Sequence, residues 1–168
     1  RRHAGRIFYN QVRLSGQVPQ VCILFGPSPA GAAYLPAFSD VVIMVNKNAS
    51  AYLGSPRMAE MVIGEKTTLE DMGGARMHCT VSGLGDFLVN TEAEAIEIAR
   101  NYFRYMPQNW RQKPALAESC SPRPGREIGE IIPPNQNQPF NMYELIERLV
   151  DEDSFLEIKK LFAREIIV

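Results

Sequence analysis

The chain has 168 residues, 45% hydrophobic and 22% charged, a composition typical of one globular domain with a packed core. A net charge of −1 excludes the basic surface that nucleic acid or an anionic membrane would require. The apolar runs are far shorter than a membrane span, and the N-terminal RRHAGRIFYNQ lacks the apolar segment of a secretory signal.

The first part of the chain predicts alternating helices and strands. Short apolar runs that are rich in valine and isoleucine and bounded by proline or glycine predict buried strands. Two capping boxes, Thr67-Thr-Leu-Glu70 and Thr91-Glu-Ala-Glu94, mark helix starts. In chain order we expect a helix at 5–14, strands at 20–25 and 40–45 with a turn and short helix between them, a third strand at 51–53, and helices at 56–63, 67–73 and 91–106.

The second part of the chain has a different character. Residues 107–139 contain seven of the twelve prolines and show no apolar periodicity, which predicts a connector. Asn141 and Asp153 are expected to cap two further helices, at 142–150 and 154–162. The apolar stretch 165–168 predicts the start of a strand whose continuation is missing, so we expect the chain to be a piece of a longer protein.

Cysteine and histidine content limits the possible chemistry. Cys22, Cys79 and Cys120 form neither a disulfide framework nor a zinc-binding CxxC pattern, which favours a reducing compartment, the cytoplasm. The two histidines, His3 and His78, are too few for a multi-histidine metal site. We interpret His78, beside a strand-like stretch, as a hydrogen-bonded structural residue rather than an acid or base.

The stretch VCILFGPSPAGAAYL leads from a strand into a helix through a turn that is typical of a binding or reacting site. Gly26 and Gly31 have the spacing of a phosphate-binding loop, but alanines replace the required Lys-Ser/Thr pair, so an ATPase is excluded. The segment also nearly matches the GxSxG elbow of serine hydrolases. Because Pro29 follows Ser28 and has no N–H to form an oxyanion hole, we reject that interpretation as well.

An oxyanion-binding helix start fits the same residues better. Ser28 is expected to be the N-cap and Pro29 the first helical residue, so that Ala30, Gly31 and Ala32 present free backbone N–H groups. Their small side chains would let a carbonyl oxygen approach, with the helix dipole behind the N–H groups. The residues alone leave a second interpretation open, in which the small side chains only let the helix pack on the strand.

Four segments of the chain are distinctive: GPSPAGAAYLPAFSD, LGSP, GEKTTLEDMGGARMHCTVSG and NQPFNMYELIERLVD. Together they resemble a known family, the carboxyltransferase (beta) subunits of biotin-dependent acyl-CoA carboxylases of the propionyl-CoA and methylcrotonyl-CoA type, and the resemblance covers essentially the whole chain. It implies an α/β, crotonase-like fold, a spiral of ββα units, present as a partial domain. Residues 1–106 would be the later part of the N-terminal domain, 107–140 the proline-rich connector, and 141–168 helices and a first strand leading into a missing C-terminal domain.

The resemblance also implies an activity, the transfer of a carboxyl group from carboxybiotin to the α-carbon of a propionyl-CoA-like thioester. Backbone N–H groups would stabilise the thioester enolate. The expected partners are acyl-CoA, a biotin carboxyl carrier, a biotin carboxylase subunit and further copies of the chain, with no nucleic acid, membrane or metal. Two alternatives are the carboxyltransferase of a biotin-dependent acyl-CoA decarboxylase and an assembly fragment that is inactive in isolation.

Carried over residue by residue, the family's glycine pair falls on Ala30-Gly31 in the propionyl type and on Gly31-Ala32 in the methylcrotonyl type. The resemblance therefore implies that the N–H groups of Ala30, Gly31 and Ala32 are catalytic. Tyr34 is expected either to line the acyl pocket or to fill the core. The predicted substrate-binding residues are Ser28, Tyr34, Gly73 and Gly74, although for Gly73-Gly74 the interpretation as a helix stop and turn is favoured.

Overall fold

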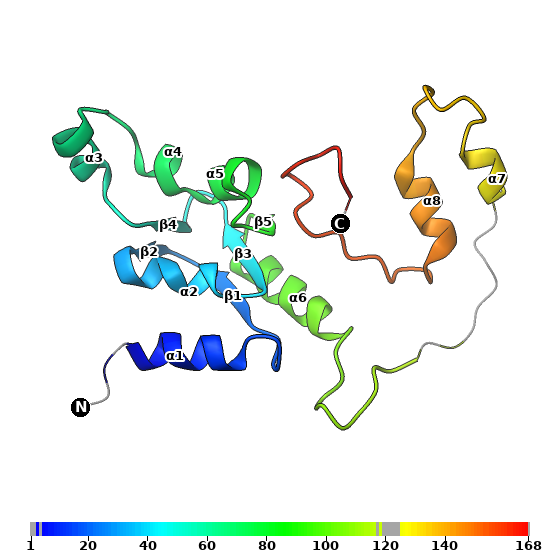
Figure 1. The fold of residues 1–168 in the computed structure, drawn as a ribbon, viewed down its shortest axis with the longest axis horizontal. Helices are drawn as coiled ribbons and strands as arrows, with labels where there is room; N and C mark the ends of the chain where they lie inside the picture. Colours follow the sequence, from blue (N-terminus) through cyan, green and yellow to red (C-terminus); the bar gives the residue numbers. More distant parts are fainter. Residues whose placement is uncertain (1–2, 4, 117, 119–124, 168) are drawn as a thin grey trace.

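The computed structural model describes residues 3, 5–116, 118 and 125–167, so Cys120 lies outside the described residues. Residues 5–106 form the body, which contains all the strands, and residues 125–167 form the arm (Figure 1). The arm lies beside the body, and its final segment returns toward the sheets.

Two small parallel sheets form the centre of the body. The three-stranded sheet has the order β1-β3-β5 and the two-stranded sheet pairs β2 with β4, all in parallel. The strands are β1 (Val21–Leu24), β2 (Pro27–Pro29), β3 (Val41–Val45), β4 (Ser50–Tyr52) and β5 (Phe87–Val89). The three predicted strands are confirmed as β1, β3 and β4, whereas the three-residue strands β2 and β5 were not predicted.

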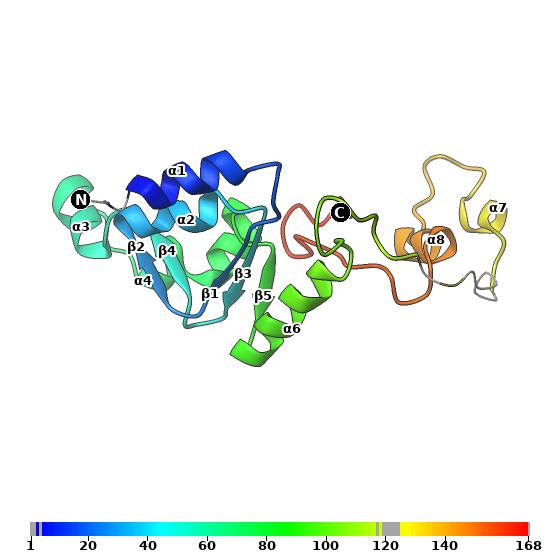
Figure 2. The ribbon, with the colours of Figure 1, turned by 90° about the horizontal axis from the view of Figure 1, so that it is seen from below.

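The core is built around β3. All five of its residues are buried, because β3 has a strand on each side and a helix against its face. That helix is α6 (Glu92–Phe103), whose Ala95 and Ala99 pack into the same cluster. Figure 2 shows α1 and α2 on one side of the strands and α6 on the other. An unbroken apolar run, rather than an alternating one, is what a strand covered on both faces requires.

Local capping signals set the starts of three helices in the body, α3 (Pro56–Ile63), α4 (Leu69–Gly73) and α6. Helix α3 spans Pro56–Ile63 as predicted, because Ser55 accepts a hydrogen bond from the Met58 N–H at 3.3 Å and Gly64, with φ of 74°, ends it. At α6, Thr91 accepts from the Glu94 N–H at 3.2 Å, so that cap is confirmed. The remaining helices of the body are α1 (Gly5–Leu14), η1 (Ala30–Ala33), α2 (Tyr34–Ala37), α4 (Leu69–Gly73), α5 (Ala75–Met77) and the π-helical turn η2 (His78–Ser82).

Two predicted helix boundaries shift by a few residues. Helix α4 is capped by Thr68, whose hydroxyl accepts from the Asp71 N–H at 3.1 Å, and not by Thr67. Helix α6 ends at Phe103 instead of 106, and the chain continues in tighter turns up to Pro107. Both shifts leave the predicted elements in place.

The arm contains α7 (Ile128–Ile131) and α8 (Met142–Leu149). Asn141 caps α8 as predicted, accepting from the Tyr143 N–H at 3.1 Å. The second predicted helix, at 154–162, is wrong: this segment is extended and turned. The left-handed backbone of Asp153 (φ 58°) and Lys159 (φ 55°) interrupts a helix, and Lys159 donates its backbone N–H to the Asp86 carbonyl at 3.0 Å instead.

The predicted strand at 165–168 also differs from the structure. Its described part, residues 165–167, forms turns, and residue 168 lies outside the described residues. In the described part of the chain, each helix is too short or too polar to cross a membrane. The same residues contain no cluster of three or more acidic, histidine or cysteine side chains that could hold a metal ion.

Candidate functional site

The turn singled out in the sequence joins β2 to a helix start. Pro29 is extended, with φ of −87° and ψ of 155°, and occupies the cap position, and η1 begins at Ala30. The predicted N-cap role of Ser28 is therefore wrong. Ser28 lies in β2, opposite Ala51 of β4, and its buried hydroxyl donates to the Ala32 carbonyl at 3.0 Å. Because Ser28 pairs with β4 as part of β2, the cap of η1 is Pro29, one residue later than predicted. The local sequence does not show this strand pairing.

Ala30 adopts a backbone conformation that alanine rarely takes. Its φ of 51° lies in the left-handed region, which costs a non-glycine residue roughly 1–2 kcal/mol. The sharp reversal at this residue turns the chain from β2 into η1. Ala30 is one of five described non-glycine residues with positive φ, and it lies at one of the positions where the family that the sequence resembles carries a glycine.

The first turn of η1 begins at an exposed part of the surface, at Ala30 and Gly31. The first N–H groups of a helix have no acceptor within the helix. Gly31 is exposed, and a Cβ built on it would meet no atom within 4 Å. A ligand oxygen therefore has room to approach Gly31 and its neighbour Ala32, the arrangement that an oxyanion-binding turn requires.

A cavity of about 420 Å³ lies directly beside this turn. Its walls are mostly apolar and come from η1 and α2, from β4 and the residues after it, from α4, and from the π-helical turn and the residues that follow it. They are Ala33, Tyr34, Ala37, Ala51, Tyr52, Leu53, Gly54, Met72, His78 and Leu84. Tyr34 is thus on the wall of the cavity and not in the core, while its contact with an acyl group stays a prediction. Apolar walls of this kind suit a short acyl group.

A larger cavity, of about 650 Å³, lies elsewhere, between the end of α1 and the chain after α6. It is lined by residues such as Val18, Tyr102 and Trp110 and shares no residue with the turn at Gly31. The smaller cavity is the better candidate site, because its mostly apolar walls include Ala33 of η1 and so adjoin the turn at Gly31.

His78 has a structural role in the cavity wall, as predicted. Its Nε2 donates to the Ala51 carbonyl at 2.7 Å, and its Nδ1 lies 2.7 Å from the Ser82 hydroxyl. A carbonyl can only accept, so Nε2 carries the proton and Nδ1 accepts from Ser82 in the neutral ring. Both nitrogens are occupied, and the ring ties the π-helical turn to β4.

Gly73 and Gly74 permit close packing inside the body. A Cβ on Gly73 would lie 2.5 Å from the Ala51 carbonyl oxygen, and one on Gly74 would lie 2.4 Å from the Glu70 side chain. Both glycines are buried, and Gly74 forms an antiparallel bridge with Ser50. They let α4 pack closely against β4, and this packing positions the part of the cavity wall that α4 contributes, Met72. Their direct contact with substrate stays a prediction.

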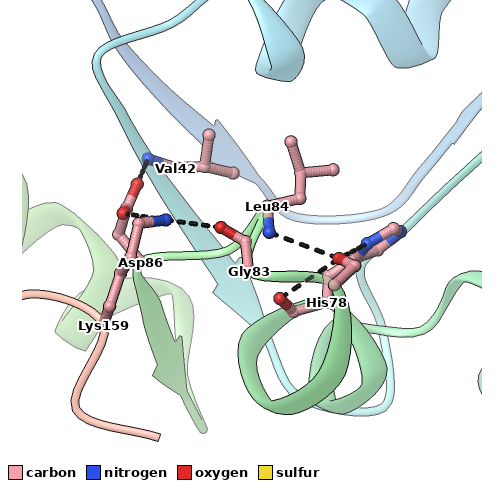
Figure 3. Close-up of polar contacts among 7 residues, drawn as sticks. Val42, His78, Gly83, Leu84, Asp86 and Lys159 are labelled. Atoms are coloured by element: carbon pink, nitrogen blue, oxygen red, sulfur yellow. Dashed lines mark hydrogen bonds and ion pairs between the residues drawn. The ribbon is translucent and has the colours of Figure 1, made fainter. Parts of the chain in front are cut away.

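Asp86 is a buried carboxylate that the sequence analysis did not single out. One of its oxygens accepts from the Val42 N–H at 2.7 Å, and the other lies 2.8 Å from the Lys159 ammonium (Figure 3). Burial, and next the negative charge of Asp86, raise the pKa of the neighbouring Cys79 thiol to about 12. Nothing in the local pattern identifies Asp86 or Leu84 as important, because their partners lie far away in the chain.

The fold and the cavity define an α/β protein with an acyl-sized pocket beside a helix start. The whole chain, residues 1–168, matches the family model described as a carboxyl transferase domain. The chain therefore belongs to the carboxyl transferase domain family.

Two curated relatives show the range of similarity. An uncharacterized carboxylase, YngE of Bacillus subtilis, is 62% identical over 99% of this chain and 33% of its own length. The mitochondrial methylcrotonoyl-CoA carboxylase beta chain of Dictyostelium discoideum is 35% identical, over 99% of this chain and 29% of its own. The chain thus spans about a third of the length of these relatives.

A solved structure confirms the fold class. Transcarboxylase 12S, a hexamer crystallised with hydrolyzed methylmalonyl-coenzyme A bound, matches with a TM-score of 0.88 at 31% identity. The match covers 97% of this chain and 32% of the transcarboxylase chain. The predicted α/β crotonase-like fold and the resemblance to acyl-CoA carboxylase subunits are both confirmed.

Proposed function

We propose that this chain provides the acyl-CoA half of the carboxyltransferase site of a biotin-dependent acyl-CoA carboxylase. The observation that carries the proposal is that the first turn of η1, with Gly31 exposed, adjoins through Ala33 an apolar cavity of about 420 Å³. The thioester oxygen would accept hydrogen bonds from the turn while the acyl chain enters the cavity. Family membership and the names of the relatives support this assignment.

The proposed chemistry depends on backbone N–H groups of this segment more than on its side chains. When the α-proton of an acyl thioester is lost, negative charge develops on the thioester oxygen. Preorganised N–H donors stabilise that charge, and one such donor contributes about 10²–10³ in rate. Carboxybiotin, carried by a partner, supplies the carboxyl group when bound. His78, with both nitrogens occupied, helps to hold the cavity wall and takes no part in proton transfer.

The proposal includes the acyl group and the assembly. A propionyl-CoA-like thioester suits the apolar walls contributed by Leu53, Met72 and Leu84. The expected partners are a biotin carboxyl carrier, a biotin carboxylase subunit and further copies of the chain. A hexamer is the assembly named for transcarboxylase 12S, and it supports the expectation of a homo-oligomer.

A decarboxylase is the second candidate. Methylmalonyl-CoA decarboxylase subunit alpha of Veillonella parvula is 32% identical over 97% of this chain. The same turn and cavity would serve transfer in the opposite direction, from a carboxylated thioester to biotin. Carboxylation of propionyl-CoA that depends on ATP and a biotin carboxylase partner favours the first candidate, whereas biotin carboxylation at the expense of methylmalonyl-CoA favours the second.

The test is to remove one N–H donor from the turn in the full-length protein. Gly31→Pro deletes the donor, and proline is tolerated in the first turn of a helix. Proline restricts the preceding residue, so Ala30→Gly is combined with it to keep the left-handed turn accessible. We expect carboxyl transfer to propionyl-CoA to fall by about 10²–10³.

Ala30→Gly with Gly31→Ala is the matched control. It adds a Cβ at the same position, where no atom lies within 4 Å, and keeps the N–H. We expect this control to retain activity within a few-fold. Equal transfer rates in the proline and alanine variants would show that the Gly31 N–H does not stabilise the transition state.

A further inference from the structure

A group of polar contacts links the arm to the sheets and to the cavity wall. Asp86, whose side chain is 6% exposed, connects β3 to Lys159 through its two carboxylate oxygens. The backbones are joined as well, because the Asp86 N–H donates to the Val42 carbonyl at 2.8 Å and the Lys159 N–H donates to the Asp86 carbonyl at 3.0 Å. Two of these contacts join Asp86 to Val42 of β3 and two join it to Lys159, so Asp86 fixes Lys159 closely against the body.

The ammonium of Lys159 makes a second contact, which reaches toward the cavity. Its Nζ donates to the carbonyl of Gly83, the residue that ends the π-helical turn with φ of 72° (Figure 3). A Cβ on Gly83 would come within 3.0 Å of the Phe162 ring, so the arm also covers this glycine. Gly83 is therefore held from the arm side by one hydrogen bond and one aromatic ring.

The residue after Gly83 is part of the cavity wall. Leu84 lines the cavity, and its N–H donates to the Ser82 hydroxyl at 3.2 Å. Ser82 in turn lies 2.7 Å from Nδ1 of His78, another wall residue. A continuous series of contacts therefore runs from the arm through Gly83 and Leu84 to the wall.

We propose that Lys159, anchored by Asp86, is a positioning residue that holds the Gly83–Leu84 wall of the acyl cavity in place. The inference rests on the proposed function, since it assumes that the cavity receives the acyl group. It assigns to the arm a part in acyl recognition that neither the turn at Gly31 nor the apolar walls provide by themselves.

Burial of Asp86 gives the arrangement its rigidity. An ionised carboxylate removed from water requires a partner, and the ammonium at 2.8 Å is that partner among the described residues. Removal of Lys159 alone would leave this charge uncompensated and destabilise the body. The informative variant therefore changes both residues together, since the amide oxygen introduced by Asp86→Asn can still accept from the Val42 N–H without carrying a charge.

The test compares Asp86→Asn/Lys159→Met with Lys160→Met in the full-length protein. Lys160 is a matched control, because it is the neighbouring lysine and pairs at 3.5 Å with Glu157, away from the cavity. Isothermal titration with propionyl-CoA and with CoA itself separates acyl recognition from CoA recognition. In the double variant we expect the affinity for propionyl-CoA to fall about tenfold and the affinity for CoA to stay within about twofold. Lys160→Met should change neither.

Each of the other possible results contradicts either the inference about Lys159 or the proposed function. Unchanged propionyl-CoA affinity in the double variant would overturn the inference and leave the proposed function standing. An equal loss for both ligands would also overturn it, because a general structural defect does not distinguish the acyl group. No binding of propionyl-CoA to the unmodified protein would overturn the proposed function itself, and the inference with it.

Discussion

The body and the arm obtain their structures in different ways. In the body, β3 is buried along its whole length, and the helices around it contribute small residues to one core. In the arm, α8 buries none of its residues, Ile131 of α7 is the one buried residue among the arm's described residues, and polar contacts such as Tyr143 with Glu157 at 2.6 Å hold much of the chain. Burial fixes many residues at once, whereas each polar contact fixes only the groups that make it. We therefore expect a mutation in the body to affect the stability of the whole body. A mutation in the arm should have little effect, or an effect confined to its surroundings.

The largest difference is expected from truncating one apolar side chain in each region. Ile43 is fully buried at the centre of β3, so Ile43→Ala should lower the free energy of unfolding of the body by about 2–5 kcal/mol. Leu149, at the end of α8, is 66% exposed, and Leu149→Ala should change stability by less than about 0.5 kcal/mol. Urea denaturation of the full-length protein, with hydrogen exchange to separate the regions, measures both. Equal effects would mean that the arm is packed as well as the body.

A pH dependence specific to the body is expected next. Because burial and the Asp86 charge raise the pKa of Cys79 from 9.0 to about 12, the folded state holds this proton more tightly than the unfolded state. The resulting stabilisation is fully present below pH 9 and is lost as the pH rises toward 12. In Cys79→Ala the stability of the body should fall less steeply between about pH 9 and 11. A difference between the two proteins that stays constant over this range would contradict the prediction.

The smallest expected effect compares two helix caps. Thr91→Ala removes the cap of α6 and should cost the body about 1 kcal/mol in cooperative unfolding. Asn141→Ala removes the cap of α8, and the same chemistry should there increase hydrogen exchange within α8 alone. Amide exchange measured residue by residue distinguishes the two outcomes. Cooperative loss of both regions in either variant would show that the arm and the body unfold as one unit.

Sequence signals predicted the structure where the deciding contacts are local. Helix α3 has the predicted bounds because Ser55, Pro56 and Gly64 specify its start and end within one short stretch. The 154–162 segment failed because its backbone follows contacts with Asp86, which the helix signal at Asp153 does not include. A capping residue favours a helix, but it does not ensure one where a buried charge requires a partner.

The same distinction applies to the site. A turn of small residues between a strand and a helix start was predictable from the local sequence, and Gly31 there is exposed; that its N–H binds an oxyanion stays a prediction. The role of Ser28 was not, since β2 pairs with β4 and this pairing removes Ser28 from the cap. The wall residues Met72 and Leu84 carry no local signal, because the fold brings their segments to the cavity from separate parts of the chain.

The contact between Lys159 and Gly83 also has a consequence for synthesis. These residues are 76 positions apart, and a ribosome adds about 5–20 residues per second, so Lys159 is made roughly 4–15 seconds after Gly83. During this interval a nascent chain can already pair its strands, but its cavity lacks the hydrogen bond that fixes one wall. Acyl recognition would then mature on the ribosome later than the sheets, and a stalled chain would fold without acquiring it.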